Sequence, residues 1–239
     1  MINSLERLVP RSIQDGEVTG QETLHLHLAR YAFAASHLRP GRTLDVACGV
    51  GYGTRLLWDQ GPDCTEVIGV DQSSESIDHA LQYYSQTGIL FRVDNAMTFQ
   101  DELGYDNIVS LETIEHLPDP SGFISHILTL LKPGGMFIGS VPTTPTVDAN
   151  PHHLHDFTEK SFRRLLHSFG MLERNSLRQI QRFNPYTILA RQEARLSDLR
   201  SNLVKYYCHH PVSFLRRILS TLRYGFSNRY ITIAWEKPH

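Results

Sequence analysis

The sequence is poor in cysteine and has no long hydrophobic run, and each shortage excludes a class of protein. Its 239 residues include only Cys48, Cys64 and Cys208, which lie far apart and form no Cys-x-x-Cys pair. Neither a disulfide framework nor a structural zinc site is expected, and a reducing cytoplasm is the expected location. The longest apolar runs, such as residues 137–141, are far shorter than the roughly 20 residues that a membrane-spanning helix needs. The first residues carry charges where a secretory signal has its apolar stretch, so no signal peptide is expected.

Net charge is nearly absent, but the charges are unevenly distributed. The chain has 23 basic and 25 acidic side chains. Residues 1–160 contain 9 basic and 21 acidic side chains, whereas residues 161–239 contain 14 basic and 4 acidic ones. Two explanations remain open: the carboxy-terminal third faces an anionic partner, or it docks on the acidic part of the chain.

Short apolar segments alternate regularly with helical patterns, which predicts a doubly wound, Rossmann-like α/β fold with a mostly parallel sheet. Helices are predicted where apolar residues recur at helical spacing, and strands where short apolar runs lie between turns. The predicted strands are 42–47, 66–71, 89–94, 105–111 and 136–141, and the predicted helices are 22–38, 54–60, 73–87 and 120–131.

The pattern changes after residue 141. A polar loop with three prolines and three histidines precedes a helix predicted over 158–169. Segments 172–183 and 228–236 are predicted to complete the sheet as an antiparallel pair. Between them, the Arg- and Leu-rich residues 184–227 are predicted to form two helices of an inserted cap. We therefore expect one domain over 1–239, with an amino-terminal helical segment (1–40), a core (41–183), the insert (184–227) and a final strand (228–239).

Glycines and carboxylates follow the first three predicted strands, at the sheet edge where ligands bind in such folds. Gly49, Gly51 and Gly53 have the spacing GxGxG, not the GxGxxG of a pyrophosphate-binding turn. Asp71 lies 20 residues beyond Gly51, where a carboxylate can accept both hydroxyls of a ribose or can cap the helix after it. Residues 94–96 have two interpretations as well: they contact an adenine edge, or they only turn the chain.

Five ordered motifs resemble those of class I S-adenosylmethionine-dependent methyltransferases. They read LDVACGVGYGT, VIGVDQS, VDNAM, YDNIVSLETIEHLPDP and LLKPGGMFIGSVP, and the resemblance covers roughly residues 22–170. It implies a seven-stranded sheet whose last strand is antiparallel, S-adenosylmethionine as cofactor, and methyl transfer to a small-molecule acceptor.

The resemblance also assigns cofactor contacts. The glycines would line the methionine end with Asp45 near the ammonium group, Asp71 would hold the ribose, and Asp94 the adenine amino group. Arg30 would approach the cofactor carboxylate, for which Arg is well suited, although an exposed position is the alternative. The full expected set is Arg30, Asp45, Ala47, Gly49, Gly51, Asp71, Gln72, Asp94, Asn95, Ala96, Leu111 and Glu112.

Two clusters of acid and base side chains follow the fourth and fifth strands. Candidate catalytic bases are His153 first and His155 second, with His116 and Glu112 as further candidates. The set Glu112, Glu115, His116 and His153 has the donors of a divalent-metal site, and it is similar to that of small-RNA 2′-O-methyltransferases. It is also similar to quinone-biosynthesis O-methyltransferases, in which no metal is implied. A divalent metal is therefore an open alternative that is not expected, as is the interpretation that Glu115 and His116 merely begin a helix.

The acceptor is constrained by what the sequence lacks. The Asn/Asp-Pro-Pro-aromatic motif of enzymes that methylate planar amino groups does not follow the fourth strand, and no Pro-Cys pair suited to cytosine follows any strand. Transfer to an oxygen or nitrogen of a small molecule remains, for example a sugar, a glycan precursor or another secondary metabolite. The alternatives are a metal-assisted RNA 2′-O-methyltransferase and a non-catalytic cofactor-binding protein; a nucleic-acid partner is not expected.

The predicted helix at 212–226 is basic and amphipathic. Leu215, Ile218, Leu219 and Leu222 share one face, which we expect to pack on the domain. The alternative is contact with a membrane surface or with an anionic, lipid-linked acceptor.

Overall fold

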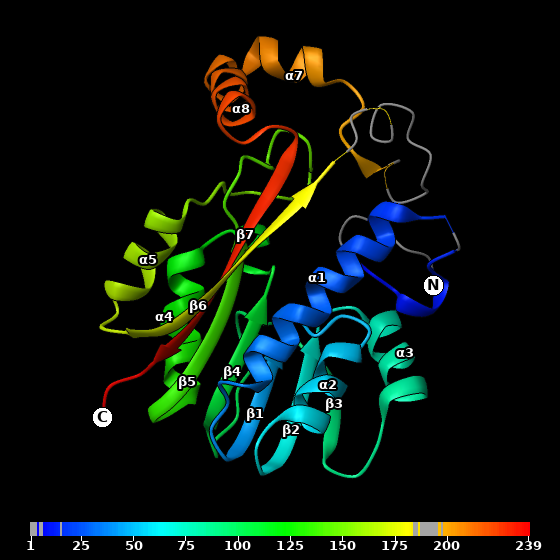
Figure 1. Ribbon diagram of the computed structural model, residues 1–239. Helices are drawn as coiled ribbons and strands as arrows, with labels where there is room; N and C mark the ends of the chain where they lie inside the picture. The colour runs from blue at the N-terminus through cyan, green and yellow to red at the C-terminus, as the bar shows by residue number, and fades with distance from the viewer. Residues whose placement is uncertain (1–3, 5–6, 15, 184–185, 187–195, 197) are drawn as a thin grey trace.

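One seven-stranded sheet organises the chain. The computed structural model describes residues 4, 7–14, 16–183, 186, 196 and 198–239. The sheet has the strand order β3-β2-β1-β4-β5-β7-β6, and β7 is antiparallel to both of its neighbours. The mostly parallel sheet and its closing antiparallel pair are confirmed (Figure 1). The strands are β1 (Gly41–Val46), β2 (Cys64–Asp71), β3 (Ile89–Val93), β4 (Tyr105–Leu111), β5 (Leu131–Pro142), β6 (Leu172–Arg182) and β7 (Ser227–Glu236).

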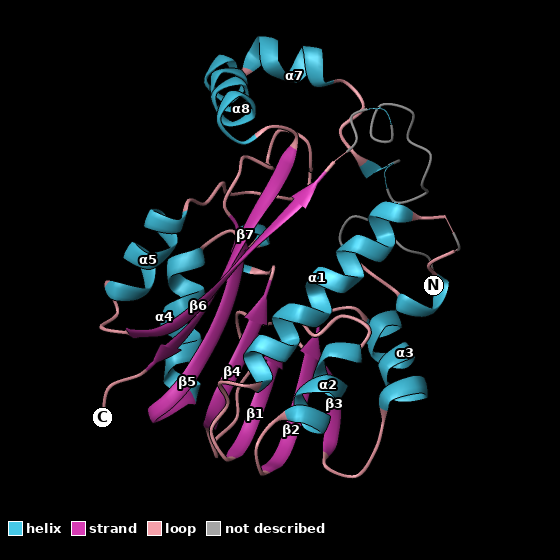
Figure 2. Ribbon diagram, viewed as in Figure 1, coloured by secondary structure: helices cyan, strands magenta, loops and turns pink. Residues whose placement is uncertain are grey.

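Helices cover both faces of the sheet (Figure 2). α1 (Val18–Ala35), α2 (Tyr52–Gln60) and α3 (Ser74–Tyr84) lie on one face, and α4 (Pro120–Leu130) and α5 (Glu159–His167) lie on the other. Side chains of β4 alternate between them: Val109 packs with α1 and α2, whereas Ile108 packs with α4 and α5. Because both faces are covered here, the central strands β4 and β5 are mostly buried, as is typical of parallel sheets.

Local sequence signals explain several helix boundaries. The Ser73 hydroxyl accepts from the Ser76 N–H at the start of α3, and Asp119 caps α4 in the same way. Thr158 and Ser161 form a reciprocal capping box at α5. The boundary of β5 differs from the prediction: the strand starts at Leu131, which pairs with Tyr105 of β4. The Lys-Pro-Gly-Gly segment follows within the strand, where the register against β4 shifts between Tyr105 and Asn107.

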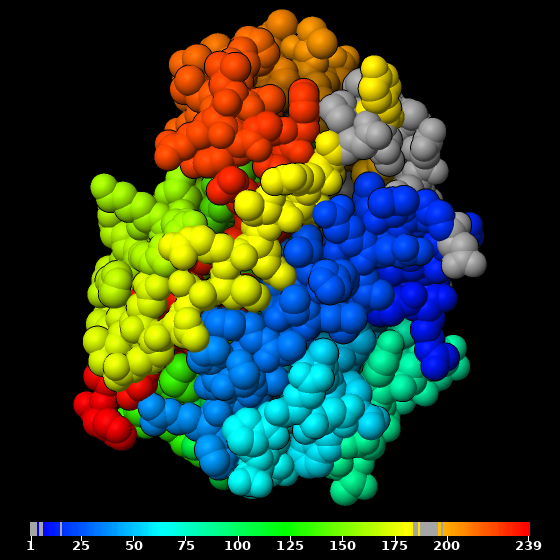
Figure 3. Space-filling view, in the orientation of Figure 1, coloured from blue at the N-terminus to red at the C-terminus, as the bar shows by residue number. Residues whose placement is uncertain are grey.

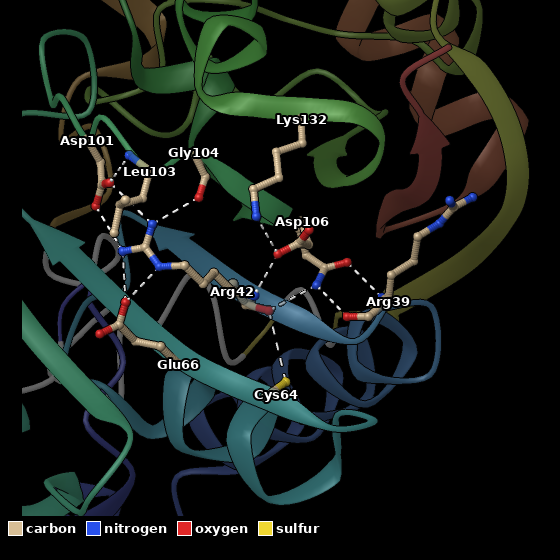
Figure 4. Close-up of polar contacts among 11 residues, drawn as sticks. Arg39, Arg42, Cys64, Glu66, Asp101, Leu103, Gly104, Asp106 and Lys132 are labelled. Atoms are coloured by element: carbon tan, nitrogen blue, oxygen red, sulfur yellow. Dashed lines mark hydrogen bonds and ion pairs between the residues drawn. The ribbon is translucent and has the colours of Figure 1, made fainter. Parts of the chain in front are cut away.

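An ion-pair cluster joins the amino-terminal ends of β1, β2 and β4 (Figure 4). The Arg42 guanidinium donates to Glu66 at 2.9 Å and to Asp101 at 3.2 and 3.1 Å, and Asp106 accepts from both Arg42 N and Lys132 Nζ at 2.9 Å. These contacts tie three strands together at the edge of the sheet opposite the site described below.

The insert forms a cap between β6 and β7. Residues 184–185, 187–195 and 197 lie outside the described residues; the remainder contains α7 (Leu203–His209) and α8 (Pro211–Tyr224), so two helices are confirmed there. The expectation that the apolar face of α8 packs on the domain is wrong: Leu215, Leu219 and Leu222 are 56%, 57% and 79% exposed. Instead, Arg217 and Thr221 face the body of the protein, and Arg217 forms an ion pair with the buried carboxylate of Asp148.

None of the helices in the described part of the chain combines the length and hydropathy that crossing a bilayer requires.

Candidate active site

A cavity of about 780 Å³ lies between the carboxyl ends of β1 and β4 and the cap. Its wall includes the loop after β1, the buried side of α1, the residues that follow β4, and the inner side of α8. This is the sheet edge where the sequence predicts a ligand. Predicted site residues on the wall are Arg30, Ala47, Gly49, Leu111, Glu112, Glu115, His116 and His153.

The backbone is left-handed at two non-glycine residues on this wall. Ala47, directly after β1, has φ 59°, and Glu112, directly after β4, has φ 52°. Such residues persist where the surrounding structure holds them, and they cluster at functional sites. Both strands therefore end in a tight backbone turn that forms part of the cavity wall.

The predicted glycines have different roles. A Cβ at Gly49 (φ +55°) would meet no atom within 4 Å, so this backbone borders open space that a ligand can approach. A Cβ at Gly51 (φ +88°) would lie 2.6 Å from the Ala80 Cβ. Gly51 is thus required for packing against α3, and it does not appear on the cavity wall.

Two aspartates lie next to the loop of residues 47–51 between β1 and α2, which we call the glycine loop. Asp45 is fully buried and accepts from the Thr54 hydroxyl at 2.6 Å. Burial, reinforced by the charge of Asp71, raises the pKa of Asp45 to about 7. Asp71 accepts from the Gly49 and Ser73 N–H groups, both at 2.9 Å. Asp71 therefore both orients the loop and begins α3; each of its oxygens retains a further lone pair for a ligand.

The predicted adenine contacts lie beside Asp71 but outside the cavity wall. Asp94 N donates to Asp71 O at 3.1 Å, which places the carboxyl ends of β2 and β3 side by side. Asp94 Oδ1 accepts from Asn95 N and Asn95 Oδ1 accepts from Met97 N, so both side chains stabilise the turn. Gln72, Asp94 and Asn95 are accessible at this edge.

Arg30 is only 2% exposed, so the alternative of a solvent-exposed arginine is wrong. Its Nε donates to Gln179 Oε1 at 2.8 Å, and its guanidinium carbon lies 4.3 Å from the centre of the Tyr230 ring. Its Nη1 is 3.8 Å from Glu112 Oε2. Arg30 is thus a buried cation on the cavity wall, held by side chains of β6, of β7 and of the turn after β4.

Sequence reasoning missed the residues that fix Arg30. Gln179 Nε2 also donates to Leu26 O at 3.0 Å, which ties β6 to α1. The available signal was the pair Gln179 and Gln181, which alternate with Ile180 along a strand. Both glutamines are buried while Ile180 is 44% exposed, so polar side chains face the protein here.

Glu112 is held from two sides. Its backbone N–H donates to Ser140 Oγ at 2.9 Å, and the Ser140 hydroxyl donates to Glu112 Oε1 at 2.7 Å. With Arg30 near its other oxygen, this carboxylate is engaged in positioning Arg30 and the turn after β4.

The structure brings the two acid–base clusters together. The rings of His116 and His153 meet edge-to-face with centroids 4.5 Å apart, and His116 Nε2 is 4.0 Å from Glu115 Oε1. Glu115 is fully buried, and neither of its carboxylate oxygens has a hydrogen-bond partner within the described part of the chain. Burial and the nearby charge of Glu112 hold the pKa of Glu115 well above its usual range.

Backbone hydrogen bonds hold the loop of residues 143–157, which we call the histidine loop, against this cluster. Leu154 N and His155 N both donate to Glu115 O, at 2.8 and 3.2 Å. His153 Nδ1 is 2.6 Å from Thr146 Oγ1, which sets the ring orientation. His155 Nε2 is 3.0 Å from Leu117 O, and His155 is not part of the cavity wall. Of these two candidate residues, His153 is therefore the one that lines the cavity.

The predicted metal set is only partly assembled. One potential ligand atom from each of Glu115, His116 and His153 lies within 4.8 Å of the others, whereas Glu112 is not in this group. One carboxylate and two imidazoles are donors that suit a divalent transition metal.

The cap is attached to the histidine loop through Asp148, another residue that sequence reasoning missed. Asp148 is 2% exposed and accepts from the Tyr207 hydroxyl at 2.6 Å and from Arg217 Nε at 2.7 Å, with a second contact from Arg217 Nη2. Arg200 donates to the Asp148 carbonyl at 3.0 Å. The cap is thus attached to the histidine loop at a position five residues before His153.

Comparison with known proteins identifies the family. The family model described as a methyltransferase domain matches residues 21–188, and the chain belongs to this family. The seven-stranded sheet is that of the class I S-adenosylmethionine-dependent methyltransferases.

Two curated relatives illustrate the sequence similarity. A Mycolicibacterium smegmatis protein named a "probable S-adenosylmethionine-dependent methyltransferase" is 30% identical over 142 residues, which cover 56% of this chain and 54% of that protein. The ubiquinone biosynthesis O-methyltransferase of Paramagnetospirillum magneticum is 33% identical over 117 residues, 47% of this chain and 46% of that protein. The chain thus spans about half the length of these relatives.

A solved structure confirms the fold across most of the chain. The N-methyltransferase NodS of Bradyrhizobium japonicum, in complex with S-adenosyl-L-homocysteine, superposes with a TM-score of 0.59 at 15% identity, covering 94% of this chain and 90% of NodS.

Proposed function

We propose that the protein transfers a methyl group from S-adenosylmethionine to a hydroxyl oxygen of a small-molecule acceptor. The observation that carries this proposal is the buried carboxylate of Glu115 beside His116 and His153, on the same cavity wall as Gly49 and Arg30. Among the described residues this carboxylate has no hydrogen-bond partner.

The residues at the strand ends fit the cofactor. The open space at Gly49 admits a ligand close to the backbone, and buried Arg30 offers a cation for a carboxylate. Asp71 retains lone pairs for two ribose hydroxyls, and the accessible Asp94 and Asn95 beside it suit an adenine edge. When bound, the cofactor supplies a sulfonium-activated, electrophilic methyl group, so the protein must mainly position the acceptor.

The base side chains suit a hydroxyl acceptor. A hydroxyl has to lose its proton as it is methylated, and a positioned general base typically contributes about 10²- to 10⁴-fold. We assign the proton acceptor to the His153 imidazole, oriented by Thr146, with Glu115 in the same cluster of side chains. An O-methyltransferase among the curated relatives agrees with this choice.

Binding and turnover test the proposal separately. We expect calorimetry to detect S-adenosylhomocysteine binding that Asp71→Ala weakens at least about tenfold, because the ribose contact is lost. His153→Ala should bind the product within about twofold but lower turnover at least about 100-fold. Turnover is followed as cofactor-dependent mass gain in a metabolite pool. The control is His152→Ala, because His152 is an exposed neighbour that is not on the cavity wall.

Unchanged affinity in Asp71→Ala would contradict the ribose assignment, and the absence of binding heat in folded protein would contradict the proposed function as a whole. The partial metal set gives a second version of the mechanism, metal-assisted transfer at Glu115, His116 and His153. It predicts that a chelator abolishes turnover and that zinc or manganese restores it, whereas the base mechanism predicts no effect.

A further inference from the structure

Helix α8 presents its apolar side to solvent and its polar side to the protein. We call Val212, Leu215, Leu219 and Leu222 the outer face; all four are exposed. The opposite side carries Arg217, Ser220 and Thr221, which line the cavity. This orientation reverses that of an ordinary surface helix, whose apolar stripe faces the core. Packing against the rest of the described residues therefore does not explain why the outer face is apolar.

The outer face has a basic edge. Arg216 and Arg223 follow it at helical spacing and are exposed, and Lys205 is exposed on α7. Residues 199–226 contain five basic side chains and no acidic one. Within the described part of the chain, neither Arg216 nor Arg223 forms an ion pair, whereas Arg217 is neutralised by Asp148.

The two explanations of the basic carboxy-terminal third can now be separated by residue. Docking on the acidic residues 1–160 accounts for Arg163 and Arg178, which pair with Glu159, and for Arg217, which pairs with Asp148. It does not account for Arg216 and Arg223, which remain available to an external anion.

The cap also carries exposed apolar side chains beside the cavity. Val204 and Phe226 both line the cavity and are 76% and 61% exposed, so they form its rim next to α8. In Figure 3, α7 and α8 project beyond the rest of the molecule, where a flat surface can reach them.

We propose that the outer face of α8 docks the protein on an anionic phospholipid bilayer. Exposed leucines flanked by arginines are the composition of a helix that lies in the membrane interface, with apolar side chains among acyl chains and cations at anionic headgroups. A second copy of this chain is a poorer occupant, because a two-fold contact on this face would bring the unpaired arginines together without a carboxylate. Docking uses the side of α8 opposite to its cavity-lining residues. It is independent of the proposed methyl transfer.

Vesicle co-sedimentation of the full chain tests the docking. The probes are phosphatidylcholine vesicles with and without about one third phosphatidylglycerol. We expect binding only to the anionic vesicles, weakened by salt. The double variant Leu219→Ser/Leu222→Ser should lower the partition coefficient at least about tenfold. Arg216→Ala/Arg223→Ala should lower it as well and reduce the salt dependence. The control is Leu103→Ser, since Leu103 is equally exposed but lies in the Arg42 cluster at the opposite sheet edge.

Each variant is checked for folding by circular dichroism and for S-adenosylhomocysteine binding, which should stay within about twofold because neither pair lies in the cofactor site. No binding to either vesicle, or equal binding by all variants, overturns the proposal. A dimer in analytical ultracentrifugation that the leucine variant abolishes also overturns it, in favour of a second copy as the occupant.

Discussion

The carboxyl group of Asp45 is buried beneath the glycine loop, and this position makes it sensitive to pH. Its folded-state pKa of about 7 lies above its ordinary value of 3.8. Between these values the folded chain keeps a proton that the unfolded chain has released. The free energy of unfolding therefore falls as pH rises through this window.

Asp45→Asn should remove much of this dependence. We expect wild-type protein to lose about 2 kcal/mol more stability between pH 5 and pH 8 than the variant, measured by urea unfolding. The amide oxygen can still accept from Thr54, so the variant should fold. Equal pH dependence in the two proteins would show that Asp45 has an ordinary pKa.

At this scale, sequence motifs located Arg30, Gly49, Asp71, Glu115 and His153 at one edge of the sheet, because strand ends converge in this fold. They did not reveal Gln179 or Asp148. Those side chains act through contacts with residues far apart in the chain, Arg30 and Arg217, and no local pattern records such a pairing.

Among the elements, the cap depends on one buried carboxylate. Asp148→Asn should weaken the hold on Arg217 and Tyr207, because a neutral amide replaces charge-assisted hydrogen bonds. We expect the KM for the acceptor to rise at least about fivefold, while the affinity for S-adenosylhomocysteine changes less than about twofold. Limited proteolysis should cleave faster within residues 203–224. Tyr207→Phe, which keeps the Arg217 contact, should show a smaller effect on both measurements.

Periodicity correctly predicted α8, but the expectation that its apolar side faces the protein was wrong. Apolar spacing measures amphipathicity, whereas the direction of the helix is decided by Asp148, which draws Arg217 inward. The strands of the core left no such ambiguity, because both faces of a parallel sheet are covered by helices.

For the whole molecule, the Arg42 cluster should contribute stability without affecting the chemistry. Arg42→Met removes hydrogen bonds to Glu66, Asp101 and the Gly104 carbonyl, and we expect a loss of about 2 kcal/mol in urea unfolding. Turnover per folded molecule should not change, since the cluster lies at the amino-terminal ends of the strands and the cavity lies at their carboxyl ends. A loss of turnover in folded variant protein would contradict this separation.

The same cluster should contribute to acid unfolding. Arg42 lowers the pKa of Asp101 to about 2, below its ordinary value of 3.8. The corresponding stability is present above pH 4 and is lost as pH falls toward 2, and Arg42→Met should lack this part of the acid transition.

The sheet of the whole molecule was predictable because each strand carried its own local signal. The attachment of the cap was not, because it depends on contacts between the residue 142–157 loop and helices more than 50 residues later.

The cap leaves the sheet and returns to it through paired residues. Arg182 at the end of β6 lies opposite Ser227 at the start of β7, and Phe183 N donates to Phe226 O at 2.8 Å. The entry and exit of the insert are therefore one strand spacing apart, about 4.8 Å. The insert can therefore be lengthened, shortened or replaced without changing the register of any strand in the sheet.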